Sequence, residues 1–230
     1  MVYLSFNTAL TRPEEIADEF DFDEVGAELP LRFRWVFWQQ LTAVQGKAAQ
    51  YCESTQPVAE CGTVESFWQL WGCLPQPSQL LQGRMESTDP ERPRQVDALM
   101  VFREGVKPQW EDKHNANGGH FQFHFKASTN PGQLDEHWNN LVLGVIGATI
   151  EPAEMITGLR LVDKLAAGAG GRAGGGLRIE VWFNEMDDED AVLMLKDNVE
   201  RCIGTRTLEG RICGIPPRAE VKSHRLTRHQ

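Results

Sequence analysis

The stretch LRFRWVFW, Leu31–Trp38, places a large apolar side chain at every second position. Successive side chains of a β-strand point to opposite faces, so one face of this segment is entirely apolar. Arg32 and Arg34 lie on the other face. A strand of this kind packs its apolar face on a core, and the stretch therefore predicts a half-exposed strand of an antiparallel sheet.

Other segments repeat this strand pattern. HFQFHFK, His120–Lys126, has phenylalanine at every second position, and LRIEVWF, Leu177–Phe183, alternates Leu, Ile, Val and Phe with Arg, Glu and Trp. ALMVF, Ala98–Phe102, is a further short apolar run. Together these segments predict a sheet with one face on the core and one face toward water.

Three segments have helical periodicity. Thr63 can cap the helix VESFWQLWGCL that follows it. LDEHWNNLVLGVIGATI, Leu134–Ile150, repeats apolar residues at helical spacing, and DDEDAVLMLKDNVERCI, Asp187–Ile203, begins with acids where the helix dipole favours them. Strands interleaved with three helices predict an α+β domain whose helices pack on one face of the sheet.

The two ends of the chain differ in charge. Residues 13–30 carry eight acids and no base, whereas residues 216–230 are basic and lack a core pattern. We expect an acidic N-terminal arm over residues 1–28, one domain over residues 29–215 and a basic tail over residues 216–230, with both ends loosely held.

Composition excludes several classes of protein. The net charge of −10 disfavours non-specific nucleic-acid binding, but leaves open the recognition of one nucleotide by a few local cations. The five cysteines form no C-x-x-C pair, which argues against a disulfide framework and a zinc site. There is no apolar run of bilayer length and no leader pattern, so we expect a cytoplasmic protein.

No catalytic, metal or cofactor motif survives inspection. GAGGRAGGG, Gly168–Gly176, loosely matches a dinucleotide fingerprint, but a strand follows it where the fingerprint needs a helix. His120 and His124 would lie roughly 13 Å apart along one strand face, too far for one zinc ion. We expect neither an enzyme nor a bound cofactor or metal.

One constellation of residues remains. Trp110 and Glu111 follow a predicted strand, while Lys164, Arg178 and Trp182 lie on the polar faces of two others. An aromatic plate, a carboxylate and cations can together bind a planar base that carries phosphates. On residue types alone, an ordinary surface loop with one tucked-in aromatic is the commoner explanation.

Five stretches resemble, in order and spacing, the eukaryotic translation initiation factor 4E family, which binds the 7-methylguanosine cap of messenger RNA. The resemblance covers roughly Leu29–Gly204. The matching stretches are LPLRFRWVFW, TVESFWQLW, VFREGVKPQWEDKHNANGGHF, LDEHWNNLVLGVIG and IEVW.

The resemblance implies a curved antiparallel sheet, with helices on its convex back and a cap slot on its concave side. It implies that Trp110 stacks on the methylated base, that Glu111 accepts hydrogen bonds from the guanine edge and that Trp182 contacts the methyl group. The family's other stacking tryptophan falls on Tyr51, which we expect to complete the sandwich.

The resemblance also assigns the cap phosphates. It places Lys164 and Arg178 at the family's phosphate-binding cations, with charge kept and hydrogen-bond geometry changed. His120 replaces an arginine of the family and is largely neutral at pH 7. Arg172, in a long glycine-rich loop, is expected to reach the phosphates or later nucleotides.

A second surface is implied on the convex back, where the family binds scaffold proteins or repressors through a helical motif with a Tyr and a Leu. The expected partner is a scaffold initiation factor 4G-like protein or a 4E-interacting repressor, bound to a chain that is monomeric on its own. Asn139 and Asn140 replace a Leu and a Glu of the family, which indicates a divergent partner. The matching positions are Leu29, Pro30, Leu31, Val64, Trp68, Asn139 and Gly147.

These departures suggest a specialised paralogue, of the kind found in kinetoplastid protists, whose messages carry a hypermethylated cap. We therefore expect recruitment of capped messages for translation. The alternative is a translational repressor or protein-interaction adaptor with weakened cap binding, which Tyr51 and His120 motivate.

Overall fold

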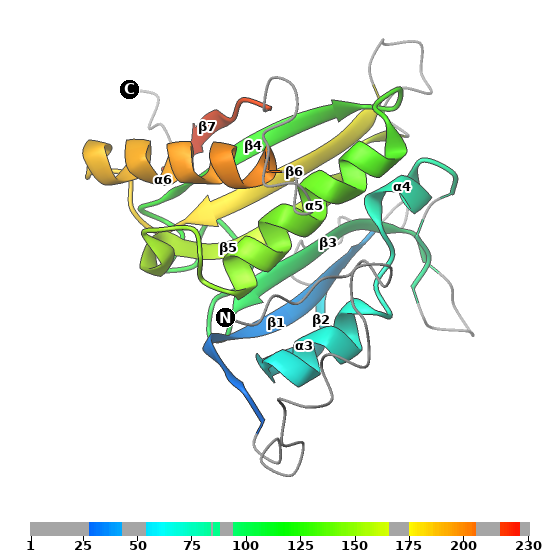
Figure 1. Ribbon diagram of the computed structural model, residues 1–230, viewed down its shortest axis with the longest axis horizontal. Helices are drawn as coiled ribbons and strands as arrows, with labels where there is room; N and C mark the ends of the chain where they lie inside the picture. The colour runs from blue at the N-terminus through cyan, green and yellow to red at the C-terminus, as the bar shows by residue number, and fades with distance from the viewer. Residues whose placement is uncertain are drawn as a thin grey trace, which may run out of the picture.

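The computed structural model describes residues 28–42, 54–83, 85–87, 94–165, 175–205 and 217–225. Figure 1 shows one sheet with helices laid across it. Tyr51, Arg172 and nearly all of the predicted acidic arm lie outside the described residues.

The described strands form one seven-stranded sheet in which every neighbouring pair is antiparallel. The strands, in their order across the sheet, are β2 (Thr55–Thr63), β1 (Pro30–Leu41), β3 (Val96–Arg103), β5 (Ile156–Asp163), β6 (Gly176–Phe183), β4 (Gly119–Lys126) and β7 (Glu220–Ser223). The predicted strands are β1, β3, β4 and β6, with β5 the strand that leads to Lys164. The predicted α+β class with a curved antiparallel sheet is confirmed.

The helices lie together on one side of the sheet (Figure 1). The described helices are α3 (Val64–Trp71), the short α4 (Pro77–Leu80), α5 (Pro131–Ile146), the 3-10 turn η2 (Ala153–Met155) and α6 (Glu189–Ile203). Thr63 caps α3 as expected, since its hydroxyl accepts a hydrogen bond from the N–H of Ser66. α5 begins earlier than its apolar stripe because the Asn130 side chain caps it. No described helix is long and apolar enough to cross a bilayer.

Strand alternation divides the apolar residues between two clusters. The main core packs the helices onto the sheet, and Trp138 of α5 is fully buried in it. We name the face without helices the open face. It was expected to be polar, but it carries a second apolar cluster, formed by Ala98, Met100, Phe102, Val106, Val162 and Trp182. Trp182 is only 1% exposed, and Phe102 meets its ring edge to face at 5.2 Å. This small cluster forms the floor of the open face.

The sheet continues into the segment predicted to be a basic tail. β7 pairs with β4, Gly119 opposite Ser223 and Gln122 opposite Glu220. His224, the next residue, is only 5% exposed. This part of the tail is therefore integral to the sheet, and it brings a buried imidazole to the open face.

Gly118 is required where the loop before β4 meets β6. A Cβ added to Gly118 would lie 1.8 Å from the carbonyl oxygen of Phe183. We predict that Gly118→Ala lowers the free energy of unfolding by about 3 kcal/mol, because overpacking of this kind forces the backbone apart. Urea unfolding measures the change. Gly83→Ala is the matched control, because nothing lies within 4 Å of a Cβ there; equal losses in both variants would contradict the prediction.

Candidate functional site

The loop between β3 and β4 presents Trp110 and Glu111, and a buried asparagine supports it from inside. The amide of Asn115 donates hydrogen bonds to the carbonyl oxygens of Lys107 and Gln109, at 2.9 and 3.0 Å. Asn115 is fully buried. These bonds hold the segment that leads into Trp110 against one buried side chain.

Asp112 braces the same loop. Its carboxylate accepts hydrogen bonds from the backbone N–H groups of Lys107 and His114, at 3.1 and 2.9 Å. Burial opposes ionisation of Asp112, but these hydrogen bonds outweigh it and lower its pKa. In the W-E-D run, Asp112 therefore holds the loop, whereas Trp110 and Glu111 are exposed.

Beside this loop lies a cavity of about 210 Å³, lined by Trp110, Glu111, Ala116, His224 and Arg225. Trp110 is 50% exposed, which is unusual for so large an apolar ring. The ring of His224 is nearly parallel to that of Trp110, with 18° between the planes and 6.2 Å between the centroids. The cavity thus combines two aromatic faces with one carboxylate.

His224 is held by three hydrogen bonds. Its backbone N–H donates to the carbonyl oxygen of Gly118 at 3.0 Å, and its ring Nδ1 lies 3.0 Å from the carbonyl oxygen of Asn115. A carbonyl only accepts, so Nδ1 carries the proton. The other nitrogen, Nε2, then accepts from His120 Nδ1 at 2.9 Å. This arrangement requires the His224 imidazole to be neutral, and burial lowers the pKa of both histidines.

Trp182 lies beneath these histidines. Its ring centroid is 4.3 Å from that of His224 and 5.7 Å from that of His120. Its indole N–H donates to the carboxylate of Glu180 at 2.9 Å. The structure therefore places Trp182 in the floor of the open face, and it does not line the cavity beside Trp110.

A charged row continues along the open face from Trp182. Glu180 is 1% exposed, and Arg178 and Arg160 approach its carboxylate at 2.6 and 3.6 Å. Burial alone would raise the pKa of Glu180, but the charges of Arg160 and Arg178 and the hydrogen bond from Trp182 lower it. Lys164, which is exposed, lies just beyond the end of β5. Two arginines therefore pair with one buried carboxylate, and Lys164 adds a third cation further along the face.

The expected partner surface is partly exposed on the helix side. Leu29 is 56% and Trp68 39% exposed. The carboxylate of Glu65 accepts from the backbone N–H of Leu29, which holds that segment against α3. Asn140, at 5% exposure, instead faces inward and donates to the carbonyl oxygen of Thr205. It therefore replaces a surface contact of the family with an internal one.

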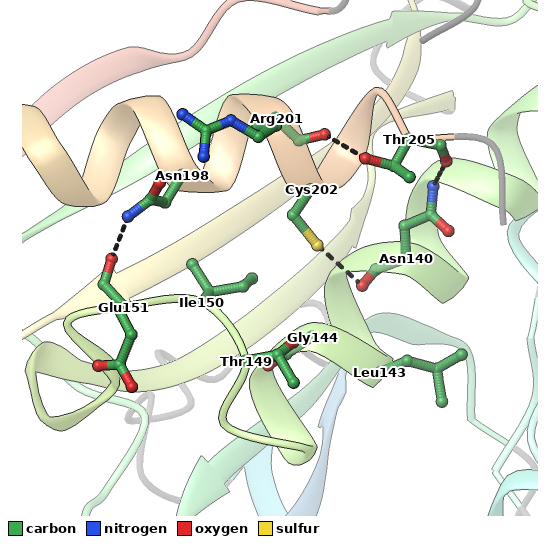
Figure 2. Close-up of a pocket in the computed structure, with 10 residues that line it drawn as sticks. All are labelled: Asn140, Leu143, Gly144, Thr149, Ile150, Glu151, Asn198, Arg201, Cys202 and Thr205. Carbon is green, nitrogen blue, oxygen red and sulfur yellow. Dashed lines mark hydrogen bonds between the residues drawn. The ribbon is translucent and has the colours of Figure 1, made fainter. Parts of the chain in front are cut away.

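A larger cavity of about 620 Å³ lies between α5 and α6 on this helix side (Figure 2). Its walls include Leu143 and Ile150, with Arg201 of α6 at the side. The thiol of Cys202 donates to the carbonyl oxygen of Asn140 at 3.2 Å, and burial raises the pKa of this thiol to about 11. The cavity lacks an aromatic plate and is on the other side of the sheet from Trp110.

Sequence reasoning found part of this site. The structure brings Trp110 and Glu111 to one cavity and sets His120 beside Trp182. Reasoning from the sequence missed His224, because its place depends on pairing between β4 and β7 about a hundred residues apart. It also missed residues that support or balance the site, namely Asn115, Arg160 and Glu180.

The paired imidazoles predict a pH-dependent stability. Burial is the main cause that lowers the pKa of both, for His120 to about 4. The unfolded chain therefore binds protons that the folded chain excludes, so stability is complete above about pH 6.5 and falls toward pH 4. We expect His120 to contribute about 3 kcal/mol to this loss. Urea unfolding between pH 4 and 7 measures it, and a His120→Gln variant with the same pH dependence would contradict the assignment.

Comparison with known proteins agrees with this fold. The family model described as Eukaryotic initiation factor 4E matches residues 30–210. Eukaryotic translation initiation factor 4E of Candida albicans is 30% identical over 169 residues, which cover 72% of this chain and 69% of that protein. The Saccharomyces cerevisiae protein of the same name is 30% identical over 184 residues, 80% of this chain and 73% of its own.

Solved structures share the architecture. Ascaris suum eIF4E-3, in complex with an m2,2,7G cap, matches with a TM-score of 0.61 and 23% identity over 85% of this chain and 98% of that one. A schistosome eIF4E complexed with m7GpppG and 4E-BP matches with a TM-score of 0.60 and 20% identity over 78% and 85%. At these identities the likeness shows the fold. Because the family model spans most of the chain, the chain belongs to the eukaryotic initiation factor 4E family.

Proposed function

We propose that this protein binds the 7-methylguanosine cap of messenger RNA, with the base stacked on Trp110 and its edge read by Glu111. The observation that carries the proposal is the cavity in which a half-exposed indole and a carboxylate adjoin. The Ascaris and schistosome relatives were solved with m2,2,7G and m7GpppG caps, which supports the same ligand class here.

The chemistry of the cap suits these two residues. Stacking of a base on an aromatic side chain contributes about 1–3 kcal/mol. Methylation at N7 makes the base cationic, which adds a cation–π attraction of about 0.5–2 kcal/mol. The same charge offsets the desolvation of Glu111, which accepts from the guanine N–H groups, so unmethylated guanine binds less well.

The phosphates would follow the charged row of the open face. Arg178 is four residues from Trp182 on one strand face, roughly 13 Å away, a distance a nucleoside triphosphate spans. Within the described residues, Nε of Arg160 and Nε of Arg178 are buried without a hydrogen-bond partner. Buried donors of this kind are unfavourable unless something accepts from them, which favours an anion here. Lys164 supplies a further cation, and Arg172 stays a prediction from the resemblance.

The protein partner would bind the helix side. We propose a scaffold or repressor helix on Leu29, Val64 and Trp68. The surface would continue to Asn139 of α5 and to Gly147, which caps that helix. The Caenorhabditis elegans eIF4E-3 relative was solved with the 4E-binding protein Mextli, and the schistosome relative with 4E-BP. Recruitment of capped messages for translation follows from both surfaces acting together.

One observation favours a second candidate, a repressor or adaptor with weakened cap binding. His120 replaces a phosphate-binding arginine of the family, and it is only 7% exposed with its Nδ1 bonded to His224. A side chain in this state offers no charge to a phosphate. The cap site would then depend more heavily on its stacking residues and on Arg178.

Titration with cap analogue tests the proposal. We expect 7-methyl-GTP to quench the fluorescence of Trp110 and to bind more tightly than GTP. Trp110→Ala should lose at least about tenfold in affinity, the lower range of one stacking contact. Glu111→Gln should mainly reduce the preference for 7-methyl-GTP over GTP. Equal binding of both nucleotides to the wild type, or no loss in Trp110→Ala, would refute cap binding at this cavity.

The partner surface has its own test. Trp68→Ala should abolish capture of a helical peptide carrying the family's Tyr and Leu motif, while 7-methyl-GTP binding stays unchanged because Trp68 lies on the opposite side of the sheet from Trp110. Leu193→Ala is the control, since Leu193 is 58% exposed on α6. If a pull-down recovers the peptide equally with Trp68→Ala and Leu193→Ala, the proposed surface is wrong.

A further inference from the structure

The second half of α5 is exposed along one stripe. After Trp138, the side chains of Asn139 and Leu143 are partly exposed, and exposed Gly147 caps the helix. These three positions are four residues apart, so they lie one above another on the same side of the helix. Asn139 and Gly147 belong to the proposed partner surface, and Leu143 lines the cavity between α5 and α6. The partner surface and this cavity therefore share one edge.

We propose that the cavity is a second docking site for the same protein partner, which inserts a large apolar side chain between α5 and α6 and sets a carboxylate against Arg201. This inference rests on the proposed partner surface, because it adds a neighbouring site for the same molecule. The two sites differ in the chemistry that they select.

The floor of the cavity suits an apolar side chain. Leu143 and Ile150 line it, and Gly144 contributes no side chain. A Cβ at Gly144 would lie 2.8 Å from the Cys202 sulfur and 2.9 Å from the Ile150 side chain, so the floor is tightly packed. The volume of about 620 Å³ is in the range of pockets that bury a drug-sized ligand, and it exceeds what one side chain needs. Apolar anchors in pockets of this kind carry much of the binding energy of a protein partner.

Hydrogen bonds hold both ends of the cavity (Figure 2). At one end, the Asn140 amide donates to the carbonyl oxygen of Thr205, and the Cys202 thiol donates to the carbonyl oxygen of Asn140 at 3.2 Å. At the other end, the Asn198 amide donates to the carbonyl oxygen of Glu151 at 2.7 Å. Walls held in this way lose little conformational entropy when a ligand binds. The cavity is therefore formed before a partner arrives.

Asn140 connects the cavity to the divergence of the partner surface. The resemblance puts a glutamate of the family at this position, whereas the Asn140 side chain is only 5% exposed. Its amide donates to the carbonyl oxygens of Ile203 and Thr205, which a glutamate carboxylate cannot do because it only accepts. The change that removes a negative charge from the partner surface therefore also builds one wall of the cavity.

The unpaired charge beside the cavity is positive. Within the described part of the chain, no carboxylate forms an ion pair with the exposed Arg201, not even Asp197 one helical turn earlier. Glu151 also lines the cavity, but its carboxylate lies 3.5 Å from the Arg32 guanidinium and accepts from the N–H of Ala153 at 2.8 Å. A partner that brings an acid to Arg201 therefore complements this charge, and a basic partner does not.

Selection with peptides on the full chain tests the proposal. The probe is a helical peptide with the family's Tyr and Leu motif, displayed as a library with eight random residues added at either end. Eight extended residues reach about 26 Å, more than the spacing of about 10 Å between packed helices. We expect selected extensions to carry a large apolar residue close to an acid. They should bind at least about tenfold more tightly than the motif alone, the effect of burying one large apolar side chain.

Variants locate the gain in affinity. Thr149→Phe fills the cavity from an exposed position on its lining, so it should remove the gain and leave binding of the motif alone unchanged. Arg201→Glu should weaken the selected peptide by up to about fivefold, the scale of an exposed ion pair, and changing the peptide's acid to lysine should restore binding. Lys126→Glu is the matched charge reversal, at an exposed residue of β4 that does not line the cavity, and should change nothing. Urea unfolding shows whether each variant is folded.

The outcomes separate this inference from the proposed partner surface. Extensions without an apolar and acidic preference would overturn it, and so would a gain that survives in Thr149→Phe or a selected peptide that binds Arg201→Glu as tightly as wild type. If the motif alone binds and Trp68→Ala removes that binding, the partner surface stands whatever the cavity does. If the motif alone does not bind wild type, the partner surface fails and the second docking site falls with it.

Discussion

The alternation of β6 is the constraint on which both halves of this molecule depend. Leu177, Ile179, Val181 and Phe183 project into the core beneath the helices. The intervening residues are thereby forced to the open face, in the order Arg178, Glu180 and Trp182. A one-residue slip of β6 against β4 would exchange the two sets, burying charges under the helices. The main core therefore fixes the register, and the register fixes the positions of the charged row and the tryptophan floor.

Glu180 shows how the open face accommodates a buried charge. A carboxylate with 1% exposure is costly unless cations and hydrogen bonds compensate it, and two arginines with the Trp182 indole do so. The same arginines are the proposed phosphate-binding cations, so a phosphate there would share their charge with the internal carboxylate. Their uncompensated Nε atoms show that the internal carboxylate does not satisfy them fully.

Patterns within single segments of the sequence predicted most of the helices and strands. Period-two alternation located β1, β4 and β6, and acids, caps and apolar stripes located α3, α5 and α6. The sequence analysis did not predict β2 and β7. β2 contains Pro57 and has mixed polarity, and β7 has four exposed residues and no apolar face. Such strands form because an existing edge offers unpaired backbone groups, which no local signal reports. Trp110 and Glu111 stand in a stretch that resembles the family, so the sequence identified them. His224 could be identified only from the assembled sheet, because its place depends on the pairing of β7 with β4.

The short edge strand β7 positions one residue of the open face, His224. β7 contributes only four paired residues, yet it delivers His224 to a point where three hydrogen bonds and three aromatic rings converge. An exposed four-residue strand alone is weakly held, since edge pairing without packing is readily lost. The convergent contacts of His224 therefore stabilise β7 as much as β7 positions His224. Asn115 connects this arrangement to the Trp110 loop, because its backbone carbonyl bonds to His224 and its side chain bonds to the turn. The segment after β7 and the loop between β3 and β4 are thus joined through one buried residue.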